Sequence, residues 1–293
     1  MSRTVFTGVY VPLVTPFTAD GALDEPALKQ LIDWVIDKGA SGLVPCGTTG
    51  ESATLSHDEH QRVIALTVAY ARGRVPVIAG TGSNSTAEAI ELTAAADELG
   101  VDGMLVIAPY YNRPSQQGII AHFTAVAAST EKPIIMYNIP KRTGINMEAA
   151  TTIALAKVPN ITGIKECGDL AQIMEIMHHT DEFGVLTGDD NLLFTLTALG
   201  GAGGICASAH FVPGEWLRIV QLLNAQKLDE ARALHYRLLP LAQVLFSEPS
   251  PGPIKAGLNM LGINAGSLRL PMTPVSEKCA ANVRGVLQGL GMI

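Results

Sequence analysis

The sequence alternates eight times between a short apolar run and a longer amphipathic stretch. The runs that read as buried strands are residues 9–17, 42–47, 75–82, 101–109, 133–139, 161–166, 183–188 and 203–207. After the first of them, Leu28, Leu31, Ile32 and Val35 recur at the spacing of one helix face, and a helical stretch follows each of the other seven. Eight such units within residues 1–226 favour a closed parallel (β/α)8 TIM barrel over an open doubly wound sheet.

Residues typical of helix starts support the helical stretches. Asp24 is the expected N-cap of the first helix. Ser56 with Glu59, and Ser85 with Glu88, have the spacing of capping boxes. These residues predict that helices begin shortly after each of the first three strands.

The strand pattern stops beyond residue 226. Residues 228–246, 254–261 and 276–290 read as helices, separated by stretches rich in proline and glycine. We therefore expect a catalytic barrel over residues 1–226 and a C-terminal helical domain over residues 227–293.

Composition limits the classes of partner. A net charge of -7 offers no basic surface for nucleic acid, and every apolar run is shorter than the roughly 20 residues that span a bilayer. Small-molecule substrates and copies of the same chain are the expected partners. Cys46, Cys167, Cys206 and Cys279 lie far apart, which predicts reduced thiols. Residues 1–6 lack the pattern of an export signal, so we expect the protein in the cytoplasm.

Lys165 lies near the carboxyl end of the sixth expected strand. Ile161 and Ile164 indicate that this strand is buried on both faces, where an unpaired ammonium is rare. One alternative is a lysine that extends to solvent or pairs with a neighbouring carboxylate. The other is a desolvated amine whose pKa falls from about 10.4 toward neutrality, which makes it a nucleophile for a carbonyl carbon.

Other reactive groups follow the other strands. Catalytic groups of a TIM barrel lie at the carboxyl ends of its strands, so these residues form one candidate constellation. Its members are residues 47–51 (Gly-Thr-Thr-Gly-Glu), residues 110–113 (Tyr-Tyr-Asn-Arg), Tyr137, Asn138, Arg142, Lys165 and residues 188–190 (Gly-Asp-Asp). An amine, a phenol, hydroxyl groups, an arginine and backbone amides are what Schiff-base chemistry on a keto acid needs.

Each of these groups also has an ordinary structural explanation. Thr48 and Thr49 suit a tight turn between glycines, and Tyr137 suits a core position with its hydroxyl at the rim. Arg142 suits a solvated surface loop, and the Asp pair at 189–190 suits the cap of the next helix. Their convergence on one face of the barrel is what favours the chemical interpretation.

Five motifs in the same order resemble the dihydrodipicolinate synthase family. They are Gly-Thr-Thr-Gly-Glu at 47–51, Pro-Tyr-Tyr-Asn-Arg-Pro at 109–114, Tyr-Asn-Ile-Pro at 137–140, Gly-Ile-Lys-Glu at 163–166 and Gly-Asp-Asp at 188–190. The resemblance extends over essentially the whole chain. It implies a lyase of the pyruvate-dependent class I aldolase superfamily, which also includes N-acetylneuraminate lyase.

The resemblance also implies a role for each matched residue. Lys165 would form an imine with pyruvate, and the enamine would then attack L-aspartate 4-semialdehyde, a step of the diaminopimelate route to lysine. Tyr137 would move the protons in a relay with Thr48 and Tyr111, and Tyr111 would reach in from a neighbouring subunit. The substrate-binding residues would be Thr49 for the pyruvate carboxylate, Arg142 for the semialdehyde carboxylate, and Gly188 and Ile205 for the pocket lining.

No cofactor is expected beyond the covalent imine on Lys165. A tyrosine donated across subunits requires at least a dimer, and the resemblance implies a homo-oligomer, a tetramer built from tight dimers. Feedback inhibition by L-lysine is a further implication, because the sequence matches the effector residues of lysine-inhibited members at Ser52, Ala53, His57, His60, Asn84, Glu88 and Tyr110. Glu88 has an alternative role in the capping box, and His57 and His60 suit an exposed helix start. We expect no metal site, since no third ligand is spaced to complete the His pair.

One departure from the family pattern leaves rival functions open. Cys167 alone separates Gly-Ile-Lys-Glu from Gly168, where the common pattern has two residues, so the loop beside the nucleophile is short. The rivals are another pyruvate-dependent aldolase, of the N-acetylneuraminate or keto-deoxy-sugar-acid type, and a non-catalytic relative that binds a keto acid. Gly-Thr-Thr-Gly-Glu and Arg142 favour a short acidic aldehyde over a polyol.

Overall fold

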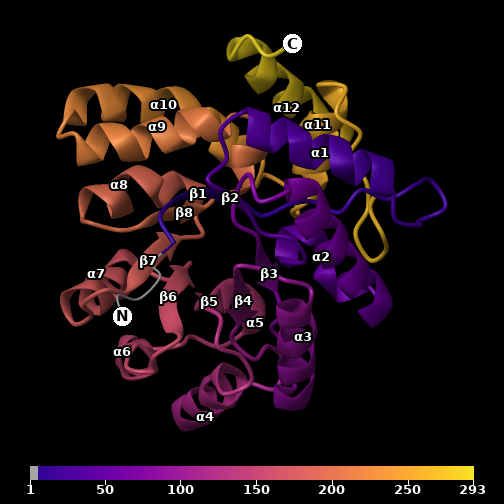
Figure 1. Ribbon diagram of the computed structural model, residues 1–293. Coiled ribbons are helices and arrows are strands. Elements are labelled where there is room, and N and C mark those ends of the chain that lie inside the picture. Colours follow the sequence, from indigo (N-terminus) through magenta and orange to yellow (C-terminus); the bar gives the residue numbers. More distant parts are fainter. Residues whose placement is uncertain (1–5) are drawn as a thin grey trace. The chain divides into compact units, whose positions relative to one another are not determined.

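A computed structural model describes residues 6–293 (Figure 1). Residues 1–5, on which the expected absence of an export signal depends, lie outside the described residues. Within the described part, eight strands match the eight expected runs: β1 (Gly8–Val11), β2 (Gly42–Leu43), β3 (Ile78–Gly80), β4 (Gly103–Ile107), β5 (Ile134–Asn138), β6 (Ile161–Glu166), β7 (Gly184–Thr187) and β8 (Gly203–Ile205).

The strand order is that of a barrel. The sheet runs β2-β1-β8-β7-β6-β5-β4-β3, with parallel pairing between the neighbours whose register is resolved. An isolated parallel bridge joins Leu43 of β2 to Val77, directly before β3, and so connects the two ends of this order. The helices between strands are α1 (Glu25–Asp37), α2 (His57–Ala71), α3 (Thr86–Glu98), α4 (Gln116–Ala127), α5 (Pro140–Thr143), α6 (Ala149–Leu155), α7 (Leu170–His178) and α8 (Leu193–Ala198), with α9 (Pro213–Asn224) after β8. The predicted (β/α)8 barrel is confirmed.

The strands are shorter than the apolar runs that predicted them. Within the barrel sheet the run 9–17 pairs only as far as Val11, although Phe17 forms an isolated antiparallel bridge with Leu23. Val14, which lies between them, is completely buried. The run 42–47 pairs only to Leu43, and Cys46 has a left-handed φ of 56°, which an extended strand does not adopt. Apolar residues therefore continue past the strands into packed loops, because burial rather than strand pairing selects them.

The helix starts follow the capping pattern with one exception. The Asp24 side chain accepts a hydrogen bond from the Ala27 N–H, and Ser56 with Glu59 forms the full capping box. The capping box expected at Ser85 is wrong for one of its two hydrogen bonds, the one from the Ser85 N–H to the Glu88 side chain. Ser85 accepts from the Glu88 N–H, but the Glu88 carboxylate accepts from the hydroxyl of Ser83. That same hydroxyl accepts the Ser85 N–H, so Ser83 takes the place that Glu88 has in a capping box.

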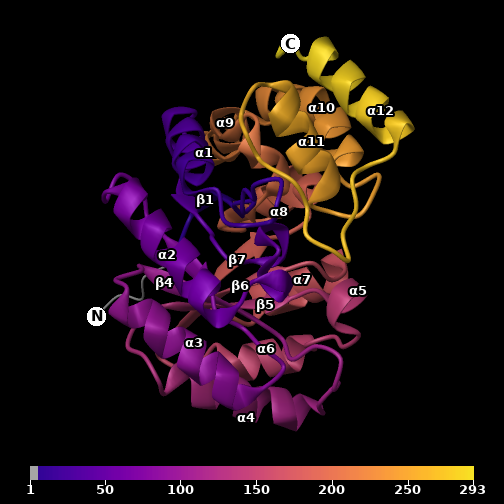
Figure 2. The same cartoon turned by 90° about the vertical axis from the view of Figure 1, so that its right-hand side faces the viewer.

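Two compact units make up the chain. The first contains the residues up to Gly8 and Ile78–Ile205, and the second contains Val9–Val77 and Cys206–Ile293. In the first unit, α3, α4, α6 and α7 pack in sequence along the strands (Figures 1 and 2). The division at residue 226 that the pattern suggests stays a prediction.

The expected C-terminal helices belong to the second unit. They are α10 (Leu228–Val244), α11 (Gly252–Met260) and α12 (Glu277–Gly289). Helix α10 packs against α9, and α12 packs against both α10 and α11, as Figure 2 shows in orange and yellow. In the same unit α1 packs against α2. The C-terminal helices therefore pack on one another and on α9.

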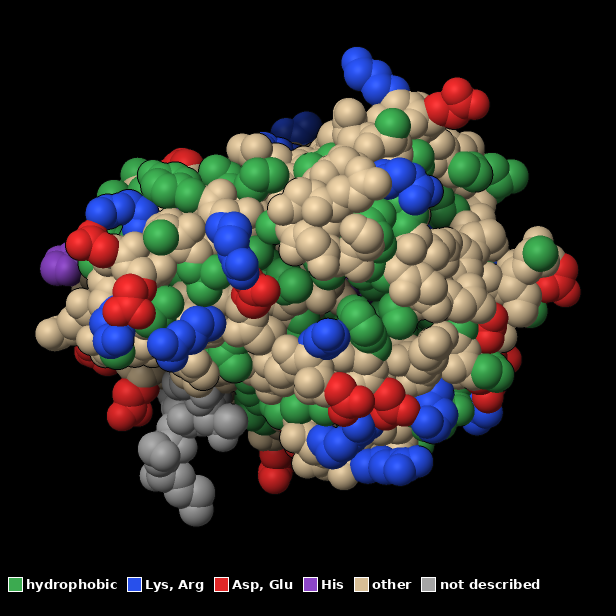
Figure 3. Space-filling model, turned by 90° about the horizontal axis from the view of Figure 1, so that it is seen from above, with side chains coloured by type: hydrophobic (Ala, Val, Ile, Leu, Met, Phe, Trp, Pro, Cys, Tyr) green, Lys and Arg blue, Asp and Glu red, His purple; other side chains and the backbone are tan. Residues whose placement is uncertain are grey.

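The surface carries charges of both signs. On the face drawn in Figure 3, acidic and basic side chains are interspersed and neither sign covers a continuous area. Among residues 6–293, every helix is too short or too polar to span a bilayer.

Candidate active site

Strands β5 and β6 bring the two principal candidates together. In their parallel register Tyr137 is the partner of Lys165, and Asn138 is the partner of Glu166. Side chains alternate between the two faces of a strand. Tyr137 and Lys165 therefore project from one face of the strand pair, and Asn138 and Glu166 project from the other.

The Lys165 side chain is buried and lies over the ring of Tyr137. Its Nζ is 4.3 Å from the ring centroid, and Lys165 and Tyr137 expose only 6% and 5% of their surfaces. Gly188, directly after β7, adjoins the lysine on another side: a Cβ built on this glycine would lie 2.5 Å from Lys165 Cε. The path of the lysine therefore requires glycine at position 188, and the amine is held against the aromatic ring.

The other face of the strand pair holds a buried carboxylate with neutral partners. Glu166 Oε1 accepts hydrogen bonds from Asn138 Nδ2 at 2.9 Å and from the Gly168 N–H at 2.6 Å. Its Oε2 accepts from Asn138 Nδ2 at 3.1 Å and from Gln172 Nε2 at 3.2 Å. Burial raises the pKa of Glu166 to about 7, and the hydrogen bonds oppose this rise only in part. This carboxylate links β5, β6 and the start of α7 behind the two principal candidates.

The short loop after Glu166 is tied to the same strands. The Cys167 N–H donates to the Asn138 carbonyl at 3.0 Å, and the next N–H, that of Gly168, donates to the Glu166 carboxylate. Burial raises the pKa of the Cys167 thiol to about 12, although the positive charge of Lys165 opposes this rise. Cys167 is therefore a protonated thiol beside the lysine, and the shortened loop still closes with its backbone N–H groups satisfied.

The segment of Tyr110 and Tyr111 is exposed in the single chain. Tyr111 exposes 88% of its surface and has a left-handed φ of 72°. Its N–H donates to the Thr143 carbonyl at 3.2 Å, which places Tyr111 beside the turn that carries Arg142 in α5. Arg142 is itself exposed. Tyr111 is therefore a large aromatic side chain that the described part of the chain leaves largely uncovered.

Thr48 and Thr49 lie in a tight loop of the second unit. Two short 3-10 helices, η1 (Thr48–Gly50) and η2 (Ser52–Thr54), meet at Glu51, whose φ of 54° and ψ of 36° are left-handed. Thr49 is buried and Thr48 is half-buried. The roles expected for the two threonines, in the proton relay and in carboxylate binding, stay predictions.

The Gly-Asp-Asp motif has the structural role that its residues suggest. Asp189 caps the short helix η3 (Asp190–Leu192) by accepting a hydrogen bond from the Asn191 N–H at 3.1 Å. Asp190 is completely buried. Ile205, the last residue of β8, is also buried, and its expected place in the pocket lining stays a prediction. Within this motif, the backbone of Gly188 lies beside the candidate lysine.

The expected effector residues are divided between the units. Ser52, Ala53, His57 and His60 belong to the second unit, and Asn84, Glu88 and Tyr110 belong to the first. Ala53, His57 and Tyr110 are exposed, whereas His60 is buried. The Asn84 carbonyl accepts a hydrogen bond from Asn112 Nδ2 at 2.9 Å, which ties this residue to the Tyr110–Tyr111 segment. In the described part of the chain, His, Cys, Asp and Glu side chains form no group of three suited to a metal ion.

Two clusters beside the candidates escaped the sequence analysis. One is the Asn138–Glu166 pair described above. The alternation of side chains along Gly-Ile-Lys-Glu could have indicated that Glu166 lies on the strand face opposite Lys165. The other joins Glu51 to Lys255 and Arg269, far along the chain, and its signal was a lysine within the apolar stretch of α11. Motif matching favours groups expected to react, and both clusters consist of groups joined to one another by ion pairs or hydrogen bonds.

Comparison with known proteins identifies the family. The chain matches the dihydrodipicolinate synthetase family over residues 5–290. The 4-hydroxy-tetrahydrodipicolinate synthase of Syntrophus aciditrophicus (strain SB) is 48% identical over 291 residues, which cover 99% of this chain and 100% of the relative. The chain belongs to the dihydrodipicolinate synthetase family. It is therefore an enzyme of the lyase type, as the motifs predicted.

Two solved structures of the family show the same fold. The dihydrodipicolinate synthase of Cyanidioschyzon merolae with lysine bound has a TM-score of 0.96 at 39% identity, covering 98% of this chain and 99% of that chain. The chloride-inhibited enzyme of Acinetobacter baumannii complexed with pyruvate has a TM-score of 0.96 at 39% identity, covering 99% of this chain and 100% of that chain. The short loop at Cys167 therefore leaves the family fold intact.

Proposed function

We propose that this chain condenses pyruvate with L-aspartate 4-semialdehyde, the reaction of a 4-hydroxy-tetrahydrodipicolinate synthase in the diaminopimelate route to lysine. The observation that carries the proposal is the buried Lys165 amine, held 4.3 Å from the centroid of the Tyr137 ring. The relatives named for this reaction and the pyruvate complex of the Acinetobacter enzyme support it. Its cytoplasmic location stays a prediction.

The proposed reaction begins with the neutral amine of Lys165. The nitrogen attacks the keto carbon of pyruvate, water leaves, and the resulting protonated imine withdraws electrons from the adjacent methyl carbon. Loss of a proton from that carbon gives an enamine, whose carbon bonds to the aldehyde carbon of the semialdehyde while the aldehyde oxygen takes up a proton. The amino group that came with the semialdehyde then attacks the imine carbon, which closes the ring and releases the Lys165 amine. In this proposal Tyr137 transfers these protons as a general acid and base, and the position of its ring against the Lys165 amine supports that role. No cofactor takes part, because the imine itself accepts the electron pair.

Borohydride trapping tests the first step. With pyruvate present, reduction of the imine adds the pyruvate skeleton to one lysine, and peptide mass spectrometry is expected to locate it at Lys165. Lys165→Met removes the nucleophile and should abolish trapping. Lys157→Met is the matched control, since Lys157 is exposed and lies outside the strand pair. Trapping that persists in Lys165→Met, or no trapping in the natural chain, would reject the mechanism.

The identity of the second substrate needs its own assay. Product analysis with pyruvate and aspartate semialdehyde is expected to give the condensed heterocyclic acid. Cleavage of N-acetylneuraminate or a keto-deoxy-sugar acid, without that condensation, would favour the rival aldolases. A chain that binds pyruvate without trapping or turnover would be a non-catalytic binder.

Lysine inhibition is part of the proposal. The structure of the Cyanidioschyzon enzyme with lysine bound supports it, as does the complete set of matched effector residues in this chain. L-Lysine is expected to lower the rate at saturating pyruvate, with D-lysine as the control. His57→Ala should weaken this inhibition while leaving the uninhibited rate unchanged, because His57 is an exposed residue at the start of α2. A rate indifferent to L-lysine would remove regulation from the proposal and leave the reaction in place.

The proposed assembly is a homo-oligomer, a tetramer of tight dimers. Tyr111 supports it, because an aromatic side chain that exposes 88% of its surface suits contact with another copy of the chain. Sedimentation velocity at several protein concentrations measures the assembly. If Tyr111 acts across subunits, inactive Tyr111→Phe and inactive Lys165→Met chains should regain activity when mixed, because one mixed site then holds both natural residues. No recovery from chains that demonstrably exchange would place Tyr111 outside the relay.

A further inference from the structure

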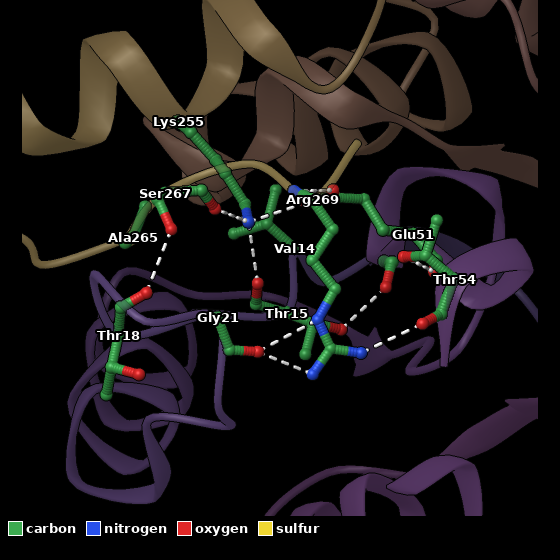
Figure 4. A network of polar contacts seen from close by, with 12 residues as sticks. Val14, Thr15, Thr18, Gly21, Glu51, Thr54, Lys255, Ala265, Ser267 and Arg269 are labelled. Carbon is green, nitrogen blue, oxygen red and sulfur yellow. Dashed lines mark hydrogen bonds and ion pairs between the residues drawn. The ribbon is translucent and has the colours of Figure 1, made fainter. Parts of the chain in front are cut away.

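Lys255 is a buried cation with three oxygen atoms close to its ammonium group (Figure 4). It lies on α11 and exposes 2% of its surface. Its Nζ is 2.6 Å from Glu51 Oε1 and donates to the Thr15 carbonyl at 2.7 Å and the Ser267 carbonyl at 2.6 Å. Burial lowers the pKa of Lys255, and the carboxylate of Glu51 opposes this shift. One side chain of the C-terminal region thus joins that region to Thr15 and Glu51, two positions distant from it in sequence.

Arg269 completes the contact from the same region. Its backbone N–H donates to Glu51 Oε2 at 3.1 Å, so both oxygens of this carboxylate are held by the C-terminal segment. Its guanidinium donates to the Gly21 carbonyl and to the Thr54 carbonyl at 2.8 Å (Figure 4). It also donates to both oxygens of Glu59. A planar group with five donors suits such divergent partners, and lysine could not replace it.

Glu51, which Lys255 and Arg269 contact, lies in the middle of the loop that contains Thr48 and Thr49. It connects η1, which contains Thr48 and Thr49, to η2, and its backbone is left-handed, which is uncommon for a residue with a side chain. Gly50, directly before it, accepts a hydrogen bond from Thr15 Oγ1 at 2.7 Å through its carbonyl, and a Cβ on Gly50 would lie 2.9 Å from a backbone oxygen. The loop therefore has little freedom while its Glu51 side chain remains bound.

We infer that Glu51, Lys255 and Arg269 form a positioning cluster through which the C-terminal region fixes the backbone of Thr48 and Thr49. These three residues do not react. They hold the conformation in which the threonines present their hydroxyl and amide groups to substrate. The inference rests on the function proposed above, which gives Thr48 and Thr49 their roles. It makes residues 255–269 necessary for turnover although they supply no reacting group.

Neutral variants of the pair test the cluster. Lys255→Met keeps the length of the side chain and removes its charge and donors, and Glu51→Gln keeps the shape of the carboxylate. A displacement of about 1 Å at a catalytic loop costs on the order of 100-fold in rate, so kcat/KM for both substrates is expected to fall by about that factor. Lys227→Met is the matched control, because its Nζ is paired with an exposed Glu230 at 3.0 Å. This control should change kcat/KM less than about twofold.

The double variant Glu51→Gln with Lys255→Met separates positioning from folding. Removal of both charges leaves no unpaired buried ion, so its unfolding midpoint should recover most of the loss seen in Lys255→Met alone. Its kcat/KM should nevertheless stay low. Recovery of activity together with stability would overturn the inference, since the cluster would then be a structural element only.

Hydrogen exchange supplies a readout that does not depend on catalysis. Amides of residues 47–55 should exchange faster in Lys255→Met and in the double variant than in the natural chain or Lys227→Met. Unchanged exchange at this loop would overturn the inference even if activity falls. If the natural chain fails borohydride trapping, the proposed function fails instead, and the exchange measurement still decides whether the cluster fixes the loop.

Discussion

Glu51 and Glu166 are both buried carboxylates at the end of a motif, but their partners differ in charge. Glu51 exposes 5% of its surface and contacts the ammonium of Lys255 and the backbone of Arg269. Glu166 exposes none, and its hydrogen-bond donors are the amides of Asn138, Gly168 and Gln172. The desolvation of a buried glutamate is therefore offset in two ways: by a counter-ion in one unit and by neutral hydrogen-bond donors in the other.

The difference decides how each site responds to change. A buried ion pair holds two charges that depend on each other, so the loss of either leaves a charge without compensation. A carboxylate among amides can take up a proton instead, and the pKa of Glu166 near 7 shows how closely its two states are balanced. The loop that contains Thr48 is thus held by an ion pair. The strand face opposite the Tyr137–Lys165 pair is held by a carboxylate whose neutral hydrogen-bond partners allow it to be protonated.

The largest effect is expected from Lys255→Met. The variant leaves Glu51 buried without its cation, which costs about 3–5 kcal/mol in free energy of unfolding. Urea unfolding followed by circular dichroism measures this against Lys227→Met, whose exposed pair should contribute below about 1 kcal/mol. Equal losses in the two variants would mean that Lys255 compensates no charge, and the contrast between the two glutamates would disappear.

The next effect is a pH dependence that belongs to Glu166. Because burial raises its pKa from 4.5 to about 7 in the folded state, the folded protein binds the proton more tightly than the unfolded chain. Its contribution to stability is complete below pH 4.5 and is lost as the pH rises through 7. This shift corresponds to about 3 kcal/mol across that window.

Glu166→Gln removes this titration and keeps the size of the side chain. Urea unfolding of both proteins between pH 4.5 and 8 is expected to show the natural chain losing stability relative to the variant as the pH rises. Parallel curves would show that the amide donors hold the carboxylate as firmly as a cation does. The comparison requires the same buffer strength throughout, since surface charges also titrate in this range.

Much of the architecture was readable from periodicity because burial repeats along the chain. The strand Ile161–Glu166 was predicted to the residue, and Asp24 and Ser56 cap their helices as expected. The same signal overextended other strands, since residues such as Val14 are buried in loops rather than paired. The Ser85 capping box failed because Ser83, two residues earlier, competes for Glu88.

The candidate site was predictable to the extent that its groups have distinctive chemistry. Lys165 stood out because it is a lysine in an apolar strand, and Tyr137 because it ends the strand before it. The register between β5 and β6 places the two residues together. Glu51, Lys255 and Arg269 could not be joined in the same way, because their contact spans more than 200 positions and depends on how the loops after the strands fold. Sequence shows which side chains are unusual for their surroundings, and the fold shows which of them meet.

The smallest effect is expected at the edge of the Glu166 cluster. Asn146 Oδ1 accepts a hydrogen bond from Asn138 Nδ2 at 2.8 Å, and its Nδ2 donates to Gln172 Oε1 at 2.7 Å. Asn146→Ala removes these bonds and the longer one that Gln172 Nε2 donates to Asn146 Oδ1 at 3.4 Å, but it leaves the donors of Glu166 in place. It should therefore cost about 1 kcal/mol and keep the same pH dependence as the natural chain. If Asn146→Ala alters that pH dependence as much as Glu166→Gln does, the outer amides set the proton affinity of the carboxylate. The cluster would then act as a single cooperative network, and burial alone would no longer explain why Glu166 differs from Glu51.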